Sequence, residues 1–358
     1  MDMARAVIQT AVNRYEMREI PIPDPGPDGA ILRVEANGLC GSDIEVFRGV
    51  LAPGALPLAP GHEALGVIER LGPGAARAWQ LAEGDRVAVH SHLRCGRCRG
   101  CHTGKRCRAP FKGYARVYGW LHPDTPPRLW GGMATHMYLA PEAMLVPMDR
   151  NGPLGPAAFF TAMANAIDWT QDVGGVEPSD RVAIFGPGAR GLACVIAARQ
   201  AGATSIAVVG LEGDRRRLGV ARALGAATLV SDGGSNVEAL AQALGGPPTL
   251  IIDVTPISTA VVTDALHALD LGGRLVLAGL KGDVTAELPV DLMIHKQLRV
   301  LTGYGKSLEA MEAGIRIIES GRWPLDLIAT HSFGLDEAEM AIEAAEAGGE
   351  VVQARIEP

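Results

Sequence analysis

The pattern of apolar and polar positions divides the chain into two unlike parts. Up to about residue 150, short apolar runs are separated by clusters of Pro, Gly and Asp such as "PIPDPGPDG", which is typical of a strand-rich domain with many turns. The predicted strands of this part are the runs "RAVIQTAV", "AILRVEANG", "ALGVIERLG" and "DRVAVHS".

From about residue 153 onward, apolar strands alternate with Ala-rich helical stretches. The strands are "RVAIFG", "SIAVVG", "LIIDVT" and "GRLVLAG", and the helices include "ARGLACVIAARQAG", "RRLGVARALGA" and "AVVTDALHALD". This alternation predicts βαβ units and a doubly wound parallel sheet, hence an α/β fold. Beyond about residue 290, the amphipathic "SLEAMEAGIRIIESG" and the final "EAEMAIEAAEAGGEVVQARIEP" have no obvious place in either part.

Length and charge restrict the class of protein. A chain of 358 residues is long enough for two domains with cores of their own. Its 40 acidic and 33 basic residues give a net charge of −7, which argues against a general affinity for nucleic acid or anionic membranes. The first residues lack the apolar run of a signal peptide, and no uncharged apolar stretch approaches membrane-spanning length. We therefore expect a cytoplasmic protein with reduced thiols.

A glycine-rich segment, "RVAIFGPGARGLA", follows a predicted strand and opens a predicted helix. Gly186, Gly188 and Gly191 have the G-x-G-x-x-G spacing of dinucleotide-binding loops, in which the glycines allow a tight turn, close approach of a pyrophosphate and close packing of the helix. Ala189 and Arg190 belong to the same predicted cofactor site, since the helix N-terminus faces the phosphate charge.

The next strand determines which nicotinamide cofactor would bind. An acid that binds the ribose of NAD is expected at its end, but the strand ends in Gly210 and Glu212 follows two residues later. Arg215 and its neighbours Arg216 and Arg217 could favour the extra phosphate of NADP, whereas Glu212 would repel it. The sequence leaves NAD and NADP open, with NAD slightly favoured.

Four cysteines, Cys95, Cys98, Cys101 and Cys107, lie within the segment 94–108 in the spacing C-x2-C-x2-C-x5-C. Four thiolates at short spacing predict a closed, structural zinc site, and the surrounding cations lower the cost of the negative sulfurs. These cations are Arg94, Arg97, Arg99, Lys105, Arg106 and Arg108. An iron–sulfur cluster is an alternative because ferredoxin sequences begin similarly, and a zinc module that contacts nucleic acid is another.

The chain resembles the medium-chain, zinc-dependent alcohol and polyol dehydrogenases. "NGLCGSDIEVFRG", "PGHEALGVIERLG", "GDRVAV", the four-cysteine segment and "GPGARGLA" occur in the family's order, although the last cysteine gap is two residues shorter than the family's usual seven. The resemblance implies a GroES-like catalytic domain formed by residues 1–152 and 290–358. A Rossmann domain formed by residues 153–289 would be inserted between these segments.

The resemblance also implies a catalytic zinc held by Cys40 and His62. Ser42 matches the hydroxyl that hydrogen-bonds the reacting oxygen, and Asp43 matches the acid that orients the zinc-bound histidine. Glu45 takes the place of a relay histidine found in some members, so we expect it to accept a proton through ribose or water.

The family's third zinc ligand is missing from this chain. Alignment places Thr161 at that position, and a neutral hydroxyl is a poor zinc ligand. We expect Glu63 to complete the site; weak binding by two ligands, or no catalytic zinc, are the alternatives. For the nicotinamide end of the cofactor, the resemblance implies five residues at two strand ends: Val254, Thr255, Ala278, Gly279 and Leu280.

These inferences predict a zinc-containing, NAD(P)-dependent dehydrogenase that interconverts a secondary alcohol and a ketone. The "GSD" and "GHE" forms favour a polyol, sugar alcohol or hydroxy-acid derivative as substrate. The alternatives are a member that lacks catalytic zinc and reduces an activated double bond, and a non-catalytic dinucleotide-binding protein. The family resemblance also implies a homodimer or homotetramer, and the net charge of −7 predicts no nucleic-acid or membrane partner.

Overall fold

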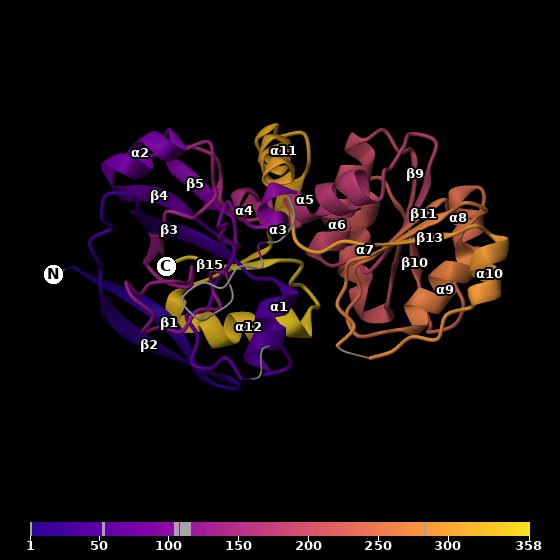
Figure 1. Ribbon diagram of the computed structural model, residues 1–358. Helices are drawn as coiled ribbons and strands as arrows, with labels where there is room; N and C mark the ends of the chain where they lie inside the picture. Colours follow the sequence, from indigo (N-terminus) through magenta and orange to yellow (C-terminus); the bar gives the residue numbers. More distant parts are fainter. Residues whose placement is uncertain (1, 52–53, 104–106, 108–115, 283) are drawn as a thin grey trace.

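The computed structural model describes residues 2–51, 54–103, 107, 116–282 and 284–358. Lys105, Arg106 and Arg108, three of the cations expected around the four cysteines, lie outside the described residues. The N-terminal strands and the C-terminal segment lie together on one side of the molecule, and the elements from the middle of the chain form the other side (Figure 1). No helix in the described residues is long and apolar enough to span a membrane.

The first part contains a mixed sheet of seven strands in the order β14-β15-β3-β4-β5-β7, with β6 also paired to β3 and with a separate β1–β2 hairpin. Its strands are β1 (Met3–Ala11), β2 (Arg14–Pro21), β3 (Ala30–Gly38), β4 (Ala64–Leu71), β5 (Arg86–Val89), β6 (His136–Leu139), β7 (Leu145–Pro147), β14 (His331–Phe333) and β15 (Ala354–Ile356). Strand β3 is buried along most of its length because apolar clusters cover both of its faces. All four strands predicted in this part are confirmed.

The C-terminal segment completes this first sheet. Strand β15 pairs antiparallel with β3, Arg355 opposite Gly38 and Ile356 opposite Asn37, and β14 pairs parallel with β15. Helix α12 (Ala338–Ala347) packs beside α1 (Gly41–Phe47) and β15. The last residues of the chain therefore lie against the strand that leads to Cys40.

The second part is a six-stranded parallel sheet in the order β10-β9-β8-β11-β12-β13. Its strands are β8 (Arg181–Phe185), β9 (Ser205–Gly210), β10 (Ala227–Val230), β11 (Leu250–Asp253), β12 (Arg274–Leu277) and β13 (Arg299–Thr302). The chain winds outward in both directions from β8, which creates the crevice at the carboxyl ends of β8 and β11 where parallel sheets bind ligands. The predicted α/β fold, a GroES-like part with a Rossmann sheet, is confirmed.

Helices cover both faces of the parallel sheet. They are α6 (Ala189–Gln200), α7 (Arg215–Ala223), α8 (Val237–Leu244), α9 (Ala260–Ala268) and α10 (Val290–His295), with a 3-10 turn, η2 (Glu212–Asp214), before α7. Strand β13 belongs to this sheet although it lies beyond residue 289, where we expected the nucleotide-binding segment to end. Its place is set by backbone pairing with β12, a contact that the apolar pattern does not reveal.

A layer of helices joins the two sheets. It consists of α4 (Leu154–Ala157), α5 (Phe160–Ile167) with the π-helical turn η1 (Asp168–Val173), and α11 (Leu308–Glu319). All eight residues of α5 are buried, because the helix packs between α6 and α11 (Figure 1). The remaining short helices are α2 (Pro73–Trp79), α3 (Arg99–His102), η3 (Leu325–Leu327) and η4 (Leu335–Glu337).

Candidate active site

One carboxylate positions both residues of the predicted zinc pair. Cys40 is the N-cap of α1, and its backbone N–H donates to Asp43 Oδ2 at 2.9 Å, as in a capping box. The other oxygen of the same carboxylate lies 3.1 Å from His62 Nδ1. Because Nδ1 faces Asp43, the ring presents Nε2 to Cys40.

The segment that carries His62 and Glu63 is held by a buried amide and by a glycine. Asn37 Oδ1 accepts a hydrogen bond from the backbone N–H of Glu63 at 3.1 Å. Gly61 has a φ of +97°, and a Cβ there would lie 2.4 Å from the backbone nitrogen of Met133, so only glycine fits. Both side chains consequently point toward Cys40.

Cys40, His62 and Glu63 converge with their ligand atoms within 4.8 Å of one another. Zinc bonds of about 2.3 Å to sulfur and about 2.0 Å to nitrogen at tetrahedral angles place those two atoms roughly 3.5 Å apart. The distance from Cys40 Sγ to His62 Nε2 is 3.4 Å, and His62 Nε2 lies 3.9 Å from Glu63 Oε1. The spacing of the thiol, imidazole and carboxylate therefore fits a zinc ion, although the carboxylate lies slightly further from the imidazole than the thiol does.

The structure places the other predicted catalytic residues around these three. Ser42 Oγ lies 2.6 Å from Cys40 Sγ and 3.4 Å from His62 Nε2. Glu45 lies on α1, and burial raises the pKa of its carboxyl while Arg190 opposes this shift. Thr161 is buried in α5, and its hydroxyl has no hydrogen-bond partner in the described part of the chain.

Burial and charge compete at the ligand residues. Burial disfavours a charged His62, but the Asp43 carboxylate and the Cys40 thiolate outweigh it and raise the pKa of this imidazole. Burial raises the pKa of Glu63, against the opposing effect of His62, Arg190 and Lys306. A divalent cation bound among these side chains would favour the anionic forms of the Cys40 and Glu63 groups in this poorly solvated place.

Two cations approach the site from other elements, and sequence reasoning did not predict this role for either. Arg190 Nη2 donates to Cys40 Sγ at 3.3 Å, and the Arg190 guanidinium carbon lies 5.7 Å from the centre of the Trp169 ring. Lys306 interacts electrostatically with Glu63 and Cys40, and burial lowers the pKa of its amine to about 8. Arg190 lies in the glycine motif, but the motif does not predict its contact with Cys40, because each of the two side chains reaches the site through the packing of the two parts of the molecule.

The four cysteines of segment 94–108, the predicted zinc lobe, also lie close together. Their Sγ–Sγ distances are 3.8 Å for Cys95–Cys101, 3.5 Å for Cys98–Cys101 and 3.8 Å for Cys98–Cys107. Four sulfurs bound to zinc at about 2.3 Å in a tetrahedron lie roughly 3.8 Å apart. Hydrogen bonding from the Arg97 backbone lowers the pKa of Cys95, which favours the thiolate that binds metal.

The glycine loop has the geometry that the motif predicts. Gly186 has a φ of +100°, and a Cβ on Gly191 would lie 1.8 Å from the Gly186 carbonyl oxygen. A Cβ on Gly188 would meet nothing within 4 Å, so the protein leaves open the space in front of this residue. Helix α6 begins directly after it at Ala189, with its free N–H groups available to a phosphate.

The residues expected at the nicotinamide end lie beside this loop. A Cβ on Gly186 would contact the side chains of Thr255 at 3.1 Å and Val254 at 3.3 Å, and one on Gly279 would lie 2.1 Å from the Thr255 carbonyl oxygen. Ala278 donates its backbone N–H to Asp253 at 2.9 Å, and Leu280 accepts from Ile257 at 3.0 Å. The strand ends of β8, β11 and β12 thus meet at one edge of the sheet.

An ion pair occupies the end of β9. Glu212, on η2, accepts from two nitrogens of Arg215, with 2.9 Å between Oε2 and Nη2. Gly210 lies next to the loop, since a Cβ there would be 2.8 Å from Cγ of Pro187. Arg216 pairs with Glu350, and Arg217 pairs with Asp214 at 3.2 Å.

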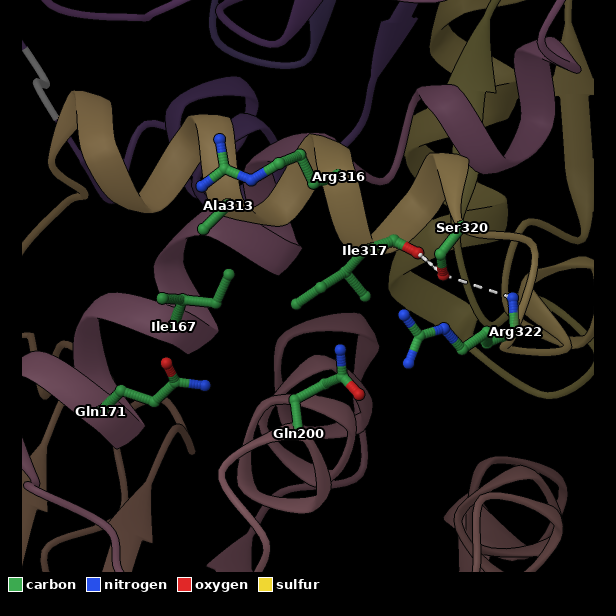
Figure 2. Close-up of a pocket in the computed structure, with 8 residues that line it drawn as sticks. All are labelled: Ile167, Gln171, Gln200, Ala313, Arg316, Ile317, Ser320 and Arg322. Carbon is green, nitrogen blue, oxygen red and sulfur yellow. Dashed lines mark hydrogen bonds between the residues drawn. The ribbon is translucent and has the colours of Figure 1, made fainter.

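A separate hollow of about 290 Å³ lies between α5 with η1, α6 and α11. Figure 2 shows Ile167 and Gln171 on one wall, Gln200 on α6, and Ala313, Arg316 and Ile317 on α11. None of its lining residues belongs to the ligand group or to the glycine loop, so this hollow is distinct from the candidate active site.

Comparisons with known proteins agree with this geometry. Residues 26–150 match the alcohol dehydrogenase GroES-like domain, and residues 189–320 match the zinc-binding dehydrogenase domain. A probable alcohol dehydrogenase of Mycobacterium tuberculosis is 36% identical over 94% of this chain and 93% of its own length. A 5-exo-hydroxycamphor dehydrogenase of Pseudomonas putida is 29% identical over 97% of each chain. A zinc-binding dehydrogenase structure from Sinorhizobium meliloti, bound to NADP, superimposes with a TM-score of 0.85 and 27% identity over the full length of both chains.

A GroES-like part joined to a Rossmann sheet, with Cys40, His62 and Glu63 gathered as a group that can hold a metal ion, defines the class of nicotinamide oxidoreductases. The chain belongs to the medium-chain, zinc-dependent alcohol dehydrogenase family. It is an NAD(P)-dependent oxidoreductase that acts on CH–OH groups of small molecules.

Proposed function

We propose that this enzyme interconverts a secondary alcohol, of the polyol, sugar-alcohol or hydroxy-acid class, and the corresponding ketone. The observation that carries the proposal is the convergence of Cys40, His62 and Glu63. These residues would hold a catalytic zinc, which when bound would act as a Lewis acid toward the substrate oxygen. Cys95, Cys98, Cys101 and Cys107 would hold a second, structural zinc, and no position would remain there for substrate.

The chain's own side chains then handle the proton and the orientation of the substrate. Ser42 Oγ, beside Cys40 and His62, is placed to accept a hydrogen bond from the substrate hydroxyl, and as it takes this proton its own hydroxyl proton would pass to the cofactor ribose or to water. Glu45, on the same helix, would accept the proton from the ribose or the water. Asp43 holds both zinc ligands in place and touches no substrate. The bound nicotinamide would take the hydride from the carbinol carbon.

The nucleotide would lie along the glycine loop from Gly186 to Gly191, with its adenosine ribose at the end of β9. We propose NAD as the preferred cofactor. Glu212 and Arg215 are 69% and 68% exposed and neutralise each other, while Arg216 and Arg217 each have a carboxylate partner. The 2′-phosphate of NADP would have to displace Glu212 from Arg215. The ribose hydroxyls of NAD could instead donate hydrogen bonds to the Glu212 carboxylate.

Exposed apolar residues at the edge strand β13 support the proposal that the protein is a homo-oligomer. Val290 and Ile294 on the adjoining α10 are 59% and 66% exposed, and Val300 on β13 is 38% exposed. An exposed apolar edge strand is a ready surface for pairing with another chain. We propose that a second copy covers this edge and forms at least a dimer.

The proposed domain division places residues 1–152 and the C-terminal strands in the catalytic domain. We assign β13 to the nucleotide-binding domain because it pairs with β12. A cytoplasmic location is also part of the proposal, since zinc binding by the lobe requires reduced thiols.

The test is metal analysis for zinc and iron combined with a panel of alcohols, ketones and activated double bonds, each with NAD(H) and NADP(H). Two zincs per chain and oxidation of secondary alcohols are expected. One zinc per chain, together with reduction of activated double bonds, would favour a family member that lacks catalytic zinc. Iron in the protein would show that the four cysteines bind an iron–sulfur cluster and not a structural zinc. Nucleotide binding without turnover of any compound would indicate a non-catalytic protein.

The replacement Glu63→Gln tests the third ligand. A neutral amide binds zinc poorly, so zinc content should fall from two toward one per chain, with a loss of alcohol oxidation of at least about a hundredfold. Glu69→Gln, on the surface of β4, is the matched control and should keep both zincs. Full zinc content and full activity in Glu63→Gln would remove Glu63 from the coordination sphere.

A further inference from the structure

We infer that Arg190 is a positioning residue that couples nucleotide binding at the glycine loop to the catalytic metal site. This inference rests on the proposed function, because it assumes a metal held by Cys40, His62 and Glu63. It gives Arg190 a task beyond the phosphate contact that its place in the G-x-G-x-x-G segment predicts.

The first observation is the direction of the side chain. Arg190 is the second residue of α6, two positions after Gly188, so its backbone belongs to the nucleotide loop. Its side chain crosses to the other part of the molecule and donates from Nη2 to Cys40 Sγ at 3.3 Å. One residue thus connects the cofactor loop directly with a metal ligand 150 positions away in sequence.

The second observation is what holds the guanidinium there. Its carbon lies 5.7 Å from the centre of the Trp169 ring, at a distance where cation–π attraction acts. Trp169 itself is buried at the start of η1, where a Cβ on Gly303 would lie 2.4 Å from its Cδ1. The ring therefore has little room to move, and the arginine is held between a fixed aromatic surface and a sulfur.

The third observation is the local charge. Cys40, Glu63, Asp43 and Glu45 all attract the guanidinium, and their combined effect outweighs the cost of its burial. The dinucleotide's pyrophosphate would bring further negative charge to the same helix N-terminus. Arg190 thus stands between two anionic groups, the metal ligands and the cofactor phosphates, and its position depends on both.

The coupling through Arg190 acts in both directions between the nucleotide and the metal. A nucleotide that fixes the first turn of α6 also fixes Arg190 against Cys40, and a metal that fixes Cys40 prepares the loop for the nucleotide. Thermodynamic linkage requires that each ligand then changes the affinity of the other by the same factor. This coupling between the two binding sites involves no covalent bond.

The experiment compares four states of the purified protein: with the catalytic-site metal and after its removal by chelation, for the native chain and for Arg190→Met. The probe is NADH or NADPH, whichever the native chain binds, and the readout is the dissociation constant from nucleotide fluorescence. In the native chain, metal removal should weaken nucleotide binding about tenfold, within the usual range of coupling between sites. In Arg190→Met the metal should change this constant less than twofold.

A second readout is independent of catalysis. With cobalt in the Cys40 site, nucleotide binding should shift the thiolate-to-metal absorption band of the native chain and leave that of Arg190→Met unchanged. Arg199→Met removes an arginine from the other end of the same helix, where it bonds the Gly225 carbonyl, and should behave as the native chain. Arg190→Lys keeps the charge without the planar fork and should retain only part of the shift.

Two outcomes would overturn the inference while leaving the proposed function intact. In one, the metal changes nucleotide affinity equally in the native chain and in Arg190→Met. In the other, Arg190→Met weakens the nucleotide equally with and without metal, which would make Arg190 a nucleotide contact only. Fewer than two metals per native chain would instead contradict the proposed function as well, so the two failures are distinguishable.

Discussion

At the scale of single residues, the site depends on groups that contact no substrate. Asp43 uses one oxygen to cap the backbone of Cys40 and the other to hold the ring of His62. A single carboxylate therefore sets the relative orientation of Cys40 and His62, the two proposed metal ligands that are 22 residues apart in sequence.

We predict that Asp43→Asn lowers the zinc affinity of the Cys40 site about 10- to 100-fold, as is usual when an outer partner of a ligand histidine is lost. The amide still accepts one hydrogen bond but no longer stabilises the ring through its charge. Competition with a chelator measures the affinity. Asp85→Asn is the control, since Asp85 accepts from the backbone three residues earlier in the same way and lies away from the ligands. Equal zinc affinity in both variants would contradict the role given to Asp43.

The predicted ligand residues differ from Arg190 and Lys306 in how far the sequence reveals them. Cys40, His62 and Glu63 lie within short motifs, and the structure brings all three together. Arg190 also lies in a motif, but its side chain leaves the nucleotide loop for Cys40 because Trp169 and the anionic ligands attract it. Such a contact depends on how two domains pack, which local sequence does not encode.

At the scale of elements, strands with a continuous apolar pattern were predictable, and those without one were not. The strands β8, β9 and β11 are buried on both faces and appear as apolar runs. Strand β2, "RYEMREIP", was not predicted, because among the described residues it pairs with β1 alone and leaves much of its surface to solvent. The π-helical turn η1 also has no recognisable sequence pattern, although it carries the tryptophan that contacts Arg190.

The glycine loop permits a prediction that separates folding from binding. Gly191→Ala would place a methyl group 1.8 Å from a carbonyl oxygen, so we expect a loss of about 1–3 kcal/mol in unfolding free energy and loss of nucleotide binding. Gly188→Ala meets no protein atom within 4 Å, so its melting temperature should stay unchanged while nucleotide affinity falls at least about tenfold, or about 1.4 kcal/mol.

Thermal melting and nucleotide titration measure the two effects. The control is Gly219→Ala at a half-buried position of α7, where an added Cβ also meets no atom within 4 Å. It should raise the unfolding free energy by about 0.5–1 kcal/mol and leave nucleotide binding unaltered. Native nucleotide affinity in Gly188→Ala would show that the cofactor does not approach this turn.

At the scale of the whole molecule, the proposed dimer edge gives a direct test. Ile294→Lys places a charge on α10 beside the proposed interface edge, where Val290, Ile294 and Val300 are exposed, so it should shift the mass in light scattering from the oligomer toward the monomer. Met340→Lys, at a 49% exposed position on α12, is the control and should keep the native mass. An unchanged oligomer in Ile294→Lys would place the interface elsewhere.

The pairing of β15 with β3 has a consequence for the order of events during translation. Residues 354–356 emerge from the ribosome long after Cys40 and His62, yet they form the neighbour of the strand whose Asn37 and Gly38 hold Glu63. The Rossmann sheet, whose strands all lie between residues 181 and 302, is synthesised earlier and contains all of its own pairings. A nascent chain can therefore form its nucleotide-binding sheet first, and the part that holds Cys40 and His62 reaches its final form only after residues 354–356 have been added.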